Sequence, residues 1–276
     1  MSSLIELFVE LLSYDFILRA MAVGILVALC AALLGVTLVL KRYSMIGDGL
    51  SHVGFGALAI AMSLNLAPLE VSIPVVLLSA FMLLRISESS QIKGDAAIAL
   101  ISSSALAIGV IVVSMTSGMN ADVCNYMFGA ILALSRGDVY LSIAVAVAVL
   151  ILYVLSYNKI FAVTFDEDFA KATGTDASQY NMLIAGLTAM VIVVGMRMMG
   201  AMLISSLIIF PALTAMRVFS SFRGVVICAA VLSVLCFVIG MAISFGVSTP
   251  AGASIVVANL AAFILFALAG RAGLKI

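Results

Sequence analysis

The sequence predicts an all-α fold, a polytopic transmembrane helical bundle, and two observations lead to this prediction. Hydrophobic residues make up 65% of the 276 residues and charged residues only 9%, whereas a soluble domain carries roughly 25% charged residues. Long apolar runs also recur along the chain, and a helix satisfies its own backbone hydrogen bonds inside a bilayer. We therefore expect residues 1–276 to form one transmembrane domain with about eight or nine spanning helices.

The individual spans follow from the length of each apolar run, because one crossing needs about 20 predominantly apolar residues. The segment between 182 and 215 is interrupted only by Arg197, so it forms either two short helices joined there or one long bent element. The candidate spans are residues 16–40, 46–64, 69–84, 96–115, 139–157, 182–194, 201–215, 225–245 and 252–269.

Basic residues predict the orientation, because cytoplasmic loops carry an excess of Lys and Arg. Lysines and arginines follow the first, third, fifth, seventh and last predicted spans, whereas only Arg19, Arg136 and Arg197 fall elsewhere. The side with the excess is expected to be cytoplasmic, which places the C-terminus inside and the N-terminus outside. The first 14 residues are compatible with a short amphipathic helix at the membrane interface.

Asp48 and His52 are the strongest candidates for a functional site. His52 is the only histidine, and it lies four positions after Asp48 at the start of an apolar run. On a helix the two side chains share one face, one turn apart. A carboxylate and an imidazole inside a membrane cost several kcal/mol unless they find partners. Both suit divalent first-row metals, so a metal site and a buried pair that holds two helices together are both open.

Four glycines surround this pair, and their role is also open. Small residues allow helices to pack closely in a membrane. Alternatively, they mark a cavity or a broken helix that exposes its backbone to a pathway. The glycines are Gly47, Gly49, Gly54 and Gly56.

Further carboxylates lie near the predicted ends of the spans. Glu70 and Asp122 fall on the outer side, where they are either solvated loop residues or groups that collect cations or dock a partner at an entrance. Asp95 and Asp138 each open a predicted span, where a carboxylate stabilises the start of a helix.

The longest charged stretch, residues 165–174, predicts a short helix over about 165–176 on the cytoplasmic face. Acidic residues come first, a lysine comes later, and a glycine then ends the helix. Two phenylalanines one turn apart would form an apolar side, which suits docking of a cytosolic partner better than a solvated linker. The residues assigned to this role are Phe165, Asp166, Glu167, Phe169, Lys171 and Gly174.

Several function classes are disfavoured. The chain has neither a phosphate-binding loop nor an H-E-x-x-H zinc motif, and no G-x-S-x-G elbow occurs, so we expect a transport protein rather than an enzyme. The 13 basic and 13 acidic residues balance, so no global charge points to nucleic acid. The four cysteines are scattered singly and show no disulfide framework.

Several blocks of the sequence resemble the permease subunits of the ABC-3 family of metal-ion ABC importers. The run Gly47-Asp48-Gly49-Leu50-Ser51-His52 is similar to the family's G-D-x-L-S-H segment. The resemblance runs nearly end to end and in family order, with Val123 and Phe55 as mild departures. The matching blocks are residues 41–60, 94–99 with 107–110, 122–132, 166–174, 200–203 and 211–215.

The resemblance implies an ABC importer permease fold and a location in the cell membrane of a prokaryote, in contact with lipid. It implies a homodimer of permeases, a cytosolic ABC ATPase subunit that hydrolyses ATP, and an extracytoplasmic metal-binding protein. It also implies that Asp48 and His52 face the translocation path. To these we add Ser51 and Glu70 as candidate residues of the metal pathway, Asp122 as a candidate entrance residue, and residues 165–174 as the contact with the ATPase.

The resemblance implies no permanently bound cofactor, because the divalent metal is the transported substrate. Imidazole favours zinc, while manganese and iron stay open. Two alternatives stand beside the metal importer: an ion-coupled secondary transporter, and an ABC permease for a chelate such as a siderophore or cobalamin.

Overall fold

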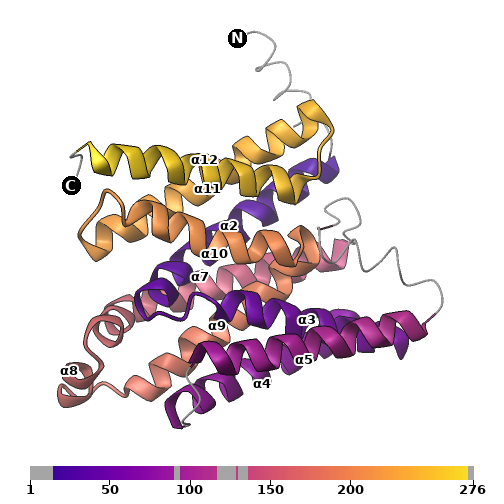
Figure 1. Cartoon of the computed structure of the whole chain (residues 1–276), viewed down its shortest axis with the longest axis horizontal. Helices are drawn as coiled ribbons and strands as arrows, with labels where there is room; N and C mark the ends of the chain where they lie inside the picture. The colour runs from indigo at the N-terminus through magenta and orange to yellow at the C-terminus, as the bar shows by residue number, and fades with distance from the viewer. Residues whose placement is uncertain (1–14, 90–93, 117–128, 130–135, 273–276) are drawn as a thin grey trace.

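Ten helices make up the part of the chain that the structure, a computed structural model, describes: residues 15–89, 94–116, 129 and 136–272 (Figure 1). No strand occurs among these residues. Every predicted span is a helix, which confirms the all-α prediction, whereas the helix expected in residues 1–14 lies outside the described residues. The helices are α2 (Asp15–Leu40), α3 (Ile46–Ser63), α4 (Pro68–Ser89), α5 (Gly94–Met115), α7 (Arg136–Phe165), α8 (Glu167–Ala172), α9 (Ala177–Met199), α10 (Ala201–Ala215), α11 (Phe222–Val247) and α12 (Ala251–Arg271).

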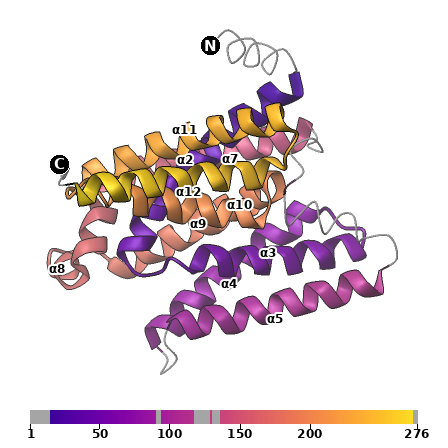
Figure 2. The same ribbon diagram turned by 45° about the horizontal axis from the view of Figure 1, so that its top comes forward.

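Helices α2 and α9 pack against each other inside the bundle, and they are the most buried of the helices long enough to span a membrane. Helices α3, α4 and α5 pack together on one side, and α11 and α12 lie together on the opposite side (Figure 2). Helix α10 contacts both groups, while α7 packs on α2 and α9. A polar group at the start of α3 therefore lies among several helices.

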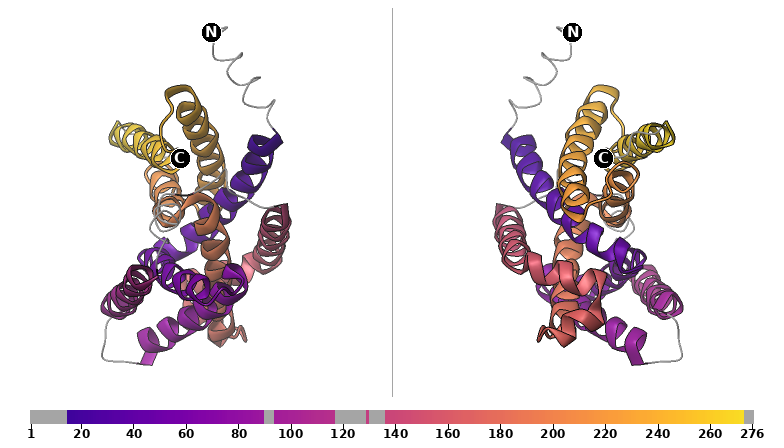
Figure 3. Two further views of the ribbon diagram at one scale, coloured as in Figure 1. Left: turned by 90° about the vertical axis from the view of Figure 1, so that its right-hand side faces the viewer. Right: turned by 90° about the vertical axis from the view of Figure 1, so that its left-hand side faces the viewer.

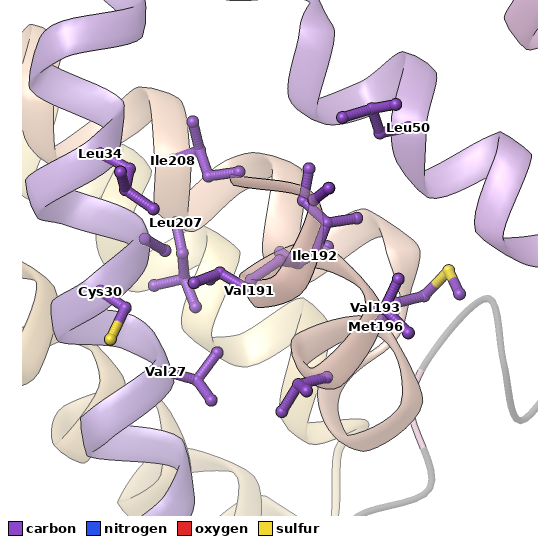
Figure 4. Close-up of a cluster of buried hydrophobic side chains, with 14 of the residues drawn as sticks. Val27, Cys30, Leu34, Leu50, Val191, Ile192, Val193, Met196, Leu207 and Ile208 are labelled. Atoms are coloured by element: carbon purple, nitrogen blue, oxygen red, sulfur yellow. The ribbon is translucent and has the colours of Figure 1, made fainter. Parts of the chain in front are cut away.

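The core that fixes α3 lies where α2, α3, α9 and α10 meet (Figure 4). Leu34, Leu50 and Ile192 are at most 1% exposed there. Helices α2 and α10 cross closely, because a Cβ atom added to Gly35 would lie 1.9 Å from the carbonyl oxygen of Ile208. Since protein interiors are close-packed, this crossing leaves little freedom in where α10 lies beside α3.

Seven described helices are long and apolar enough to cross a membrane, namely α2, α4, α5, α7, α9, α11 and α12. Helix α10 is apolar but has only 15 residues, and the 18-residue α3 carries Asp48 and His52. The prediction of a multi-pass membrane protein is confirmed, and the count of eight or nine spans is approximate.

The break between α9 and α10 resolves the ambiguous segment between 182 and 215. The two helices meet at Gly200, whose φ of +86° is a conformation that favours glycine. Arg197 lies in the last turn of α9 and donates to Asp138 in the first turn of α7, with 2.8 Å between Nη2 and Oδ2. Arg197 is one of the three basic residues away from the predicted cytoplasmic side, and this ion pair explains how its charge is tolerated there.

Helix α7 is longer than predicted. Its span was expected to end at residue 157, because a polar and a basic residue follow, yet the helix continues to Phe165. Hydropathy detects only the apolar part of a helix that can lie in a bilayer. The backbone hydrogen bonds of the same helix can continue past that part into a polar segment. The Lys159 ammonium donates to the Thr175 hydroxyl over 3.2 Å, so the extension is tied to the segment after α8.

The four glycines around Asp48 serve close packing, and α3 is unbroken through this region. A Cβ atom at Gly49 would lie 2.6 Å from an Ile98 side-chain atom, and one at Gly56 would lie 2.7 Å from the Ala105 carbonyl oxygen. A Cβ atom at Gly54 would lie 2.8 Å from the terminal methyl group of Met196 in α9. The alternative of a helix broken at these glycines is wrong.

The C-terminal ends of α2, α4, α7, α10 and α12 lie at the same end of the bundle as α8 (Figures 1 and 3). The described basic residues of the predicted cytoplasmic loops lie in or beside these helix ends, which agrees with one cytoplasmic side. They are Lys41, Arg42, Arg85, Lys159, Lys171, Arg217, Arg223 and Arg271.

We predict that this end is cytoplasmic, and paired cysteine labelling tests it. In a chain whose native cysteines are replaced by serine, Thr173→Cys should react only with membrane-permeant maleimides in intact cells. Leu66→Cys, an exposed position in the turn between α3 and α4, should react with impermeant reagents as well. The reverse pattern would contradict the orientation.

Candidate functional site

Asp48 and His52 project from the first two turns of α3 and lie close together. The distance from His52 Nε2 to Asp48 Oδ2 is 3.6 Å, which is longer than a good hydrogen bond. The Asp48 side chain is 44% exposed and that of His52 is 24% exposed. In an otherwise apolar bundle, both groups therefore keep donor and acceptor capacity for a further partner.

This geometry suits a shared divalent cation. Zinc lies about 2.0–2.2 Å from an imidazole nitrogen or a carboxylate oxygen, so two atoms on one ion lie less than about 4.4 Å apart. The pair at 3.6 Å meets this condition. No group of three or more His, Cys, Asp or Glu residues among the described ones forms a metal cluster. One chain therefore offers two such ligands here.

Ser205 is a site residue that the sequence reasoning missed. Its hydroxyl donates to Asp48 Oδ1 over 3.3 Å and also lies 3.1 Å from the carbonyl oxygen of Ala201. It stands one turn into α10, just after the break at Gly200. A hydroxyl one turn after a helix-breaking glycine is the sequence signal that could have identified it.

The other predicted pathway residues lie apart from the pair. The Ser51 hydroxyl is buried and donates to the Asp48 backbone carbonyl over 2.7 Å, so in this conformation it supports the first turn of α3. Glu70 is exposed in the first turn of α4, which follows the C-terminal end of α3. The part of α3 between His52 and that end is about 16 Å long. Asp122 lies outside the described residues.

The predicted cytoplasmic helix exists as α8, with shorter bounds than expected. Asp166 caps its start by accepting a hydrogen bond from the Phe169 backbone N–H over 2.8 Å. The backbone N–H of Thr175 donates to Ala170 and that of Gly174 to Lys171, with Gly174 at φ +82°. These bonds form a Schellman motif, so Gly174 ends the helix as predicted.

The two phenylalanines do not share this helix, which corrects the prediction. Phe165 is the last residue of α7, and its ring packs against Phe161 and Phe222, with centroid distances of 5.0 and 5.7 Å. Helix α7 runs on to Phe165 before Asp166 starts a new helix in another direction. Phe169 alone lies on α8, and it is 63% exposed. Phe169 is therefore the exposed phenylalanine of α8, and Phe165 belongs to the cluster of rings at the end of α7.

Glu167 and Lys171 form an ion pair along α8, with 3.0 Å between Oε1 and Nζ. Burial raises the pKa of Glu167. Hydrogen bonds from Lys171 and Asn181 and the charges of Lys41 and Lys171 outweigh burial, so the pKa lies below its ordinary value. Glu167 is therefore a carboxylate at neutral pH.

The chain is similar to known transport proteins over nearly its whole length. The model of the ABC 3 transport family matches residues 13–270. The manganese transport system membrane protein MntC of Halalkalibacterium halodurans is 29% identical over 98% of this chain and 91% of its own. The high-affinity zinc uptake system membrane protein ZnuB of Haemophilus influenzae is 28% identical over 91% of this chain and 97% of its own.

A solved structure agrees with these relatives. PsaBC from Streptococcus pneumoniae in complex with Fab contains a chain with a TM-score of 0.84 and 30% identity. The match covers 95% of the present chain and 94% of that chain. The arrangement of helices described above is therefore that of an ABC permease.

We predict that Ser205→Ala weakens binding of a divalent metal at Asp48 about fivefold. A hydrogen bond to a charged group contributes about 1.5–3 kcal/mol, and this one is long, so about 1 kcal/mol is expected. The measurement is the rise in unfolding temperature of the purified chain with added Zn²⁺ or Mn²⁺. Ser206→Ala is the matched control, because its buried hydroxyl has no hydrogen-bond partner. Equal metal responses of both variants would contradict this role of Ser205.

Proposed function

Because the chain belongs to the ABC 3 transport family, we propose that it is the membrane-spanning permease subunit of an ATP-driven importer for a divalent metal ion, zinc or manganese. The observation that carries this proposal is the Asp48–His52 pair at the start of α3. A carboxylate and an imidazole inside an apolar bundle are costly unless they serve a pathway or a partner.

The identity of the metal follows from ligand chemistry only in part. Imidazole suits zinc and carboxylate suits manganese, and the named relatives include transport proteins for each metal. A site with two ligands per chain would hold the ion loosely, whereas a structural four-ligand zinc site holds it firmly. Loose ligation suits a substrate that must be released.

We propose three partners for this permease. The sequence holds no phosphate-binding loop, so ATP hydrolysis would take place on a separate cytosolic ABC ATPase that docks at α8. An extracytoplasmic metal-binding protein would deliver the ion at the opposite end, near Glu70 and Asp122. A second permease copy would complete the pathway, and partly exposed Asp48 and His52 side chains are compatible with a site shared at such a pathway.

The family assignment favours this function over the two alternatives. An ion-coupled secondary transporter would need no docking helix for an ATPase, whereas α8 is capped at both ends and presents an exposed phenylalanine. A permease for a bulky chelate would not require two metal-ligating side chains on one helix face. Neither alternative accounts for Asp48 and His52 together with α8.

We predict that Asp48→Asn and His52→Ala each lower metal uptake at least about tenfold, because even outer-sphere changes cost that much at metal sites. The measurement is accumulation of radioactive zinc and manganese in cells that lack their own importers and express the whole transporter. The metal that accumulates identifies the substrate.

Ser63→Ala, at the far end of the same helix, is the control, because its hydroxyl bonds only to its own helix at Ile60. Expression level and membrane insertion of the site variants should equal those of the unchanged chain. Normal uptake by both variants would overturn the pathway role, and failure of both to insert would show a structural pair.

We predict that Phe169→Ala weakens co-purification of the ATPase about tenfold, as expected when an apolar anchor is removed from an interface. Metal-stimulated ATP hydrolysis should fall with it, while metal binding to the permease stays unchanged. Phe245→Ala is the control, because it also truncates an exposed phenylalanine. Phe245 lies near the C-terminal end of α11, on an element other than α8. Full ATPase recovery with Phe169→Ala would indicate that Phe169 rests on lipid or on its own chain.

A further inference from the structure

A partly buried polar network joins α8 to the turn from which α3 begins. Its members, the Glu167 network, are Lys41, Glu167, Lys171 and Asn181. Lys41 follows the last residue of α2, Glu167 and Lys171 belong to α8, and Asn181 lies in the second turn of α9. Three separate segments of the chain therefore meet at one carboxylate.

The contacts in this network range from 2.6 to 3.5 Å. The Lys41 ammonium donates to Asn181 Oδ1 over 2.6 Å and lies 3.5 Å from Glu167 Oε2. Asn181 Nδ2 donates to the same Glu167 oxygen over 3.3 Å, while Lys171 binds the other oxygen. The Lys41 side chain is only 10% exposed, so losing its partners would leave a poorly solvated charge.

The turn after Lys41 is short and closed by backbone hydrogen bonds, so it connects Lys41 directly to the start of α3. Arg42 has φ +62°, a left-handed conformation that is uncommon for a residue with a side chain. The backbone N–H of Tyr43 donates to Leu38 over 2.8 Å, and that of Ile46 donates to Tyr43 over 3.0 Å. Helix α3 therefore starts directly from this turn, and Asp48 lies in its first turn.

We propose that the Glu167 network transmits the displacement of α8 to the start of α3, which makes Lys41 and Asn181 positioning residues for Asp48. This inference rests on the proposed function as a metal importer. A docked ATPase moves α8, Glu167 moves with α8, and Lys41 carries the motion through the hydrogen-bonded turn to Asp48. Asn181 holds Lys41 and Glu167 together, because its amide binds both.

The alternative is a static brace between α8 and the bundle. A brace would affect stability and ATPase docking together and would leave the transport achieved per ATP unchanged. A transmitting network has the opposite signature: docking and hydrolysis persist while transport per ATP falls. The ratio of metal transported to ATP hydrolysed therefore separates the two.

The test uses the complete transporter with its ATPase, reconstituted in lipid vesicles, with Zn²⁺ and Mn²⁺ supplied separately. Asn181→Leu and Lys41→Met should each lower the transport-to-hydrolysis ratio about fivefold, which is within the range of measured coupling changes. The double variant should be no worse than the worse single one, because residues of one network are not additive. ATPase co-purification should stay within about twofold of the unchanged protein, since Phe169 is intact.

Lys159→Met is the matched control. Lys159 also holds the segment after α8, through Thr175, but it contributes nothing to the Lys41–Asn181–Glu167 contacts. Its ratio should be unchanged. Glu167→Gln is the milder variant if Lys41→Met fails to fold: the amide can still accept from Asn181, the charge facing Lys41 is gone, and an intermediate ratio is expected.

The outcomes separate this inference from the proposed function. If Asp48→Asn abolishes uptake while the network variants keep the unchanged ratio, the transmitting role is overturned and the metal importer stands. If ATPase docking and unfolding temperature fall with the ratio constant, the network is a brace and the inference is overturned. If Asp48→Asn transports normally, both proposals fall.

Discussion

The constraint on which this structure depends is the absence of water in the hydrocarbon core of the bilayer. Backbone N–H and C=O groups must then find partners within the chain, and helices provide them. The same constraint makes every polar side chain inside the bundle costly. Most of the span residues are accordingly apolar, and the few charged groups that enter the bundle meet a partner, as Arg197 meets Asp138.

Asp48 is the exception that gives the bundle its functional interpretation. Its carboxylate has a long contact with His52 and a weak one with Ser205. The close helix contacts beside it, those of Gly47 with Ile208 and of Gly49 with Ile98, hold these groups in register. A packed core therefore surrounds a site whose electrostatic needs are only partly met by its own neighbours.

Sequence reasoning recovered most of the fold because hydropathy and helix length are local properties. It identified all nine predicted spans as helices. It also identified the Asp48–His52 pair, because a spacing of four residues places both side chains on one face of a helix. It missed Ser205, because a contact across 157 positions depends on how α3 packs on α10. It also assigned Phe165 to the wrong helix, because a change of direction at Asp166 leaves the hydrophobic pattern intact.

The start of α3 also explains how a membrane-embedded carboxylate can be stable without holding a cation permanently. Asp48 lies in the first turn, where the helix dipole favours negative charge. Ser205 adds a hydroxyl donor. These neutral donors stabilise the carboxylate without neutralising it, so it retains attraction for a passing divalent ion. Because the same dipole opposes a cation at that position, the arrangement fits the proposed role of Asp48 as a pathway residue, at which an ion must bind and then leave.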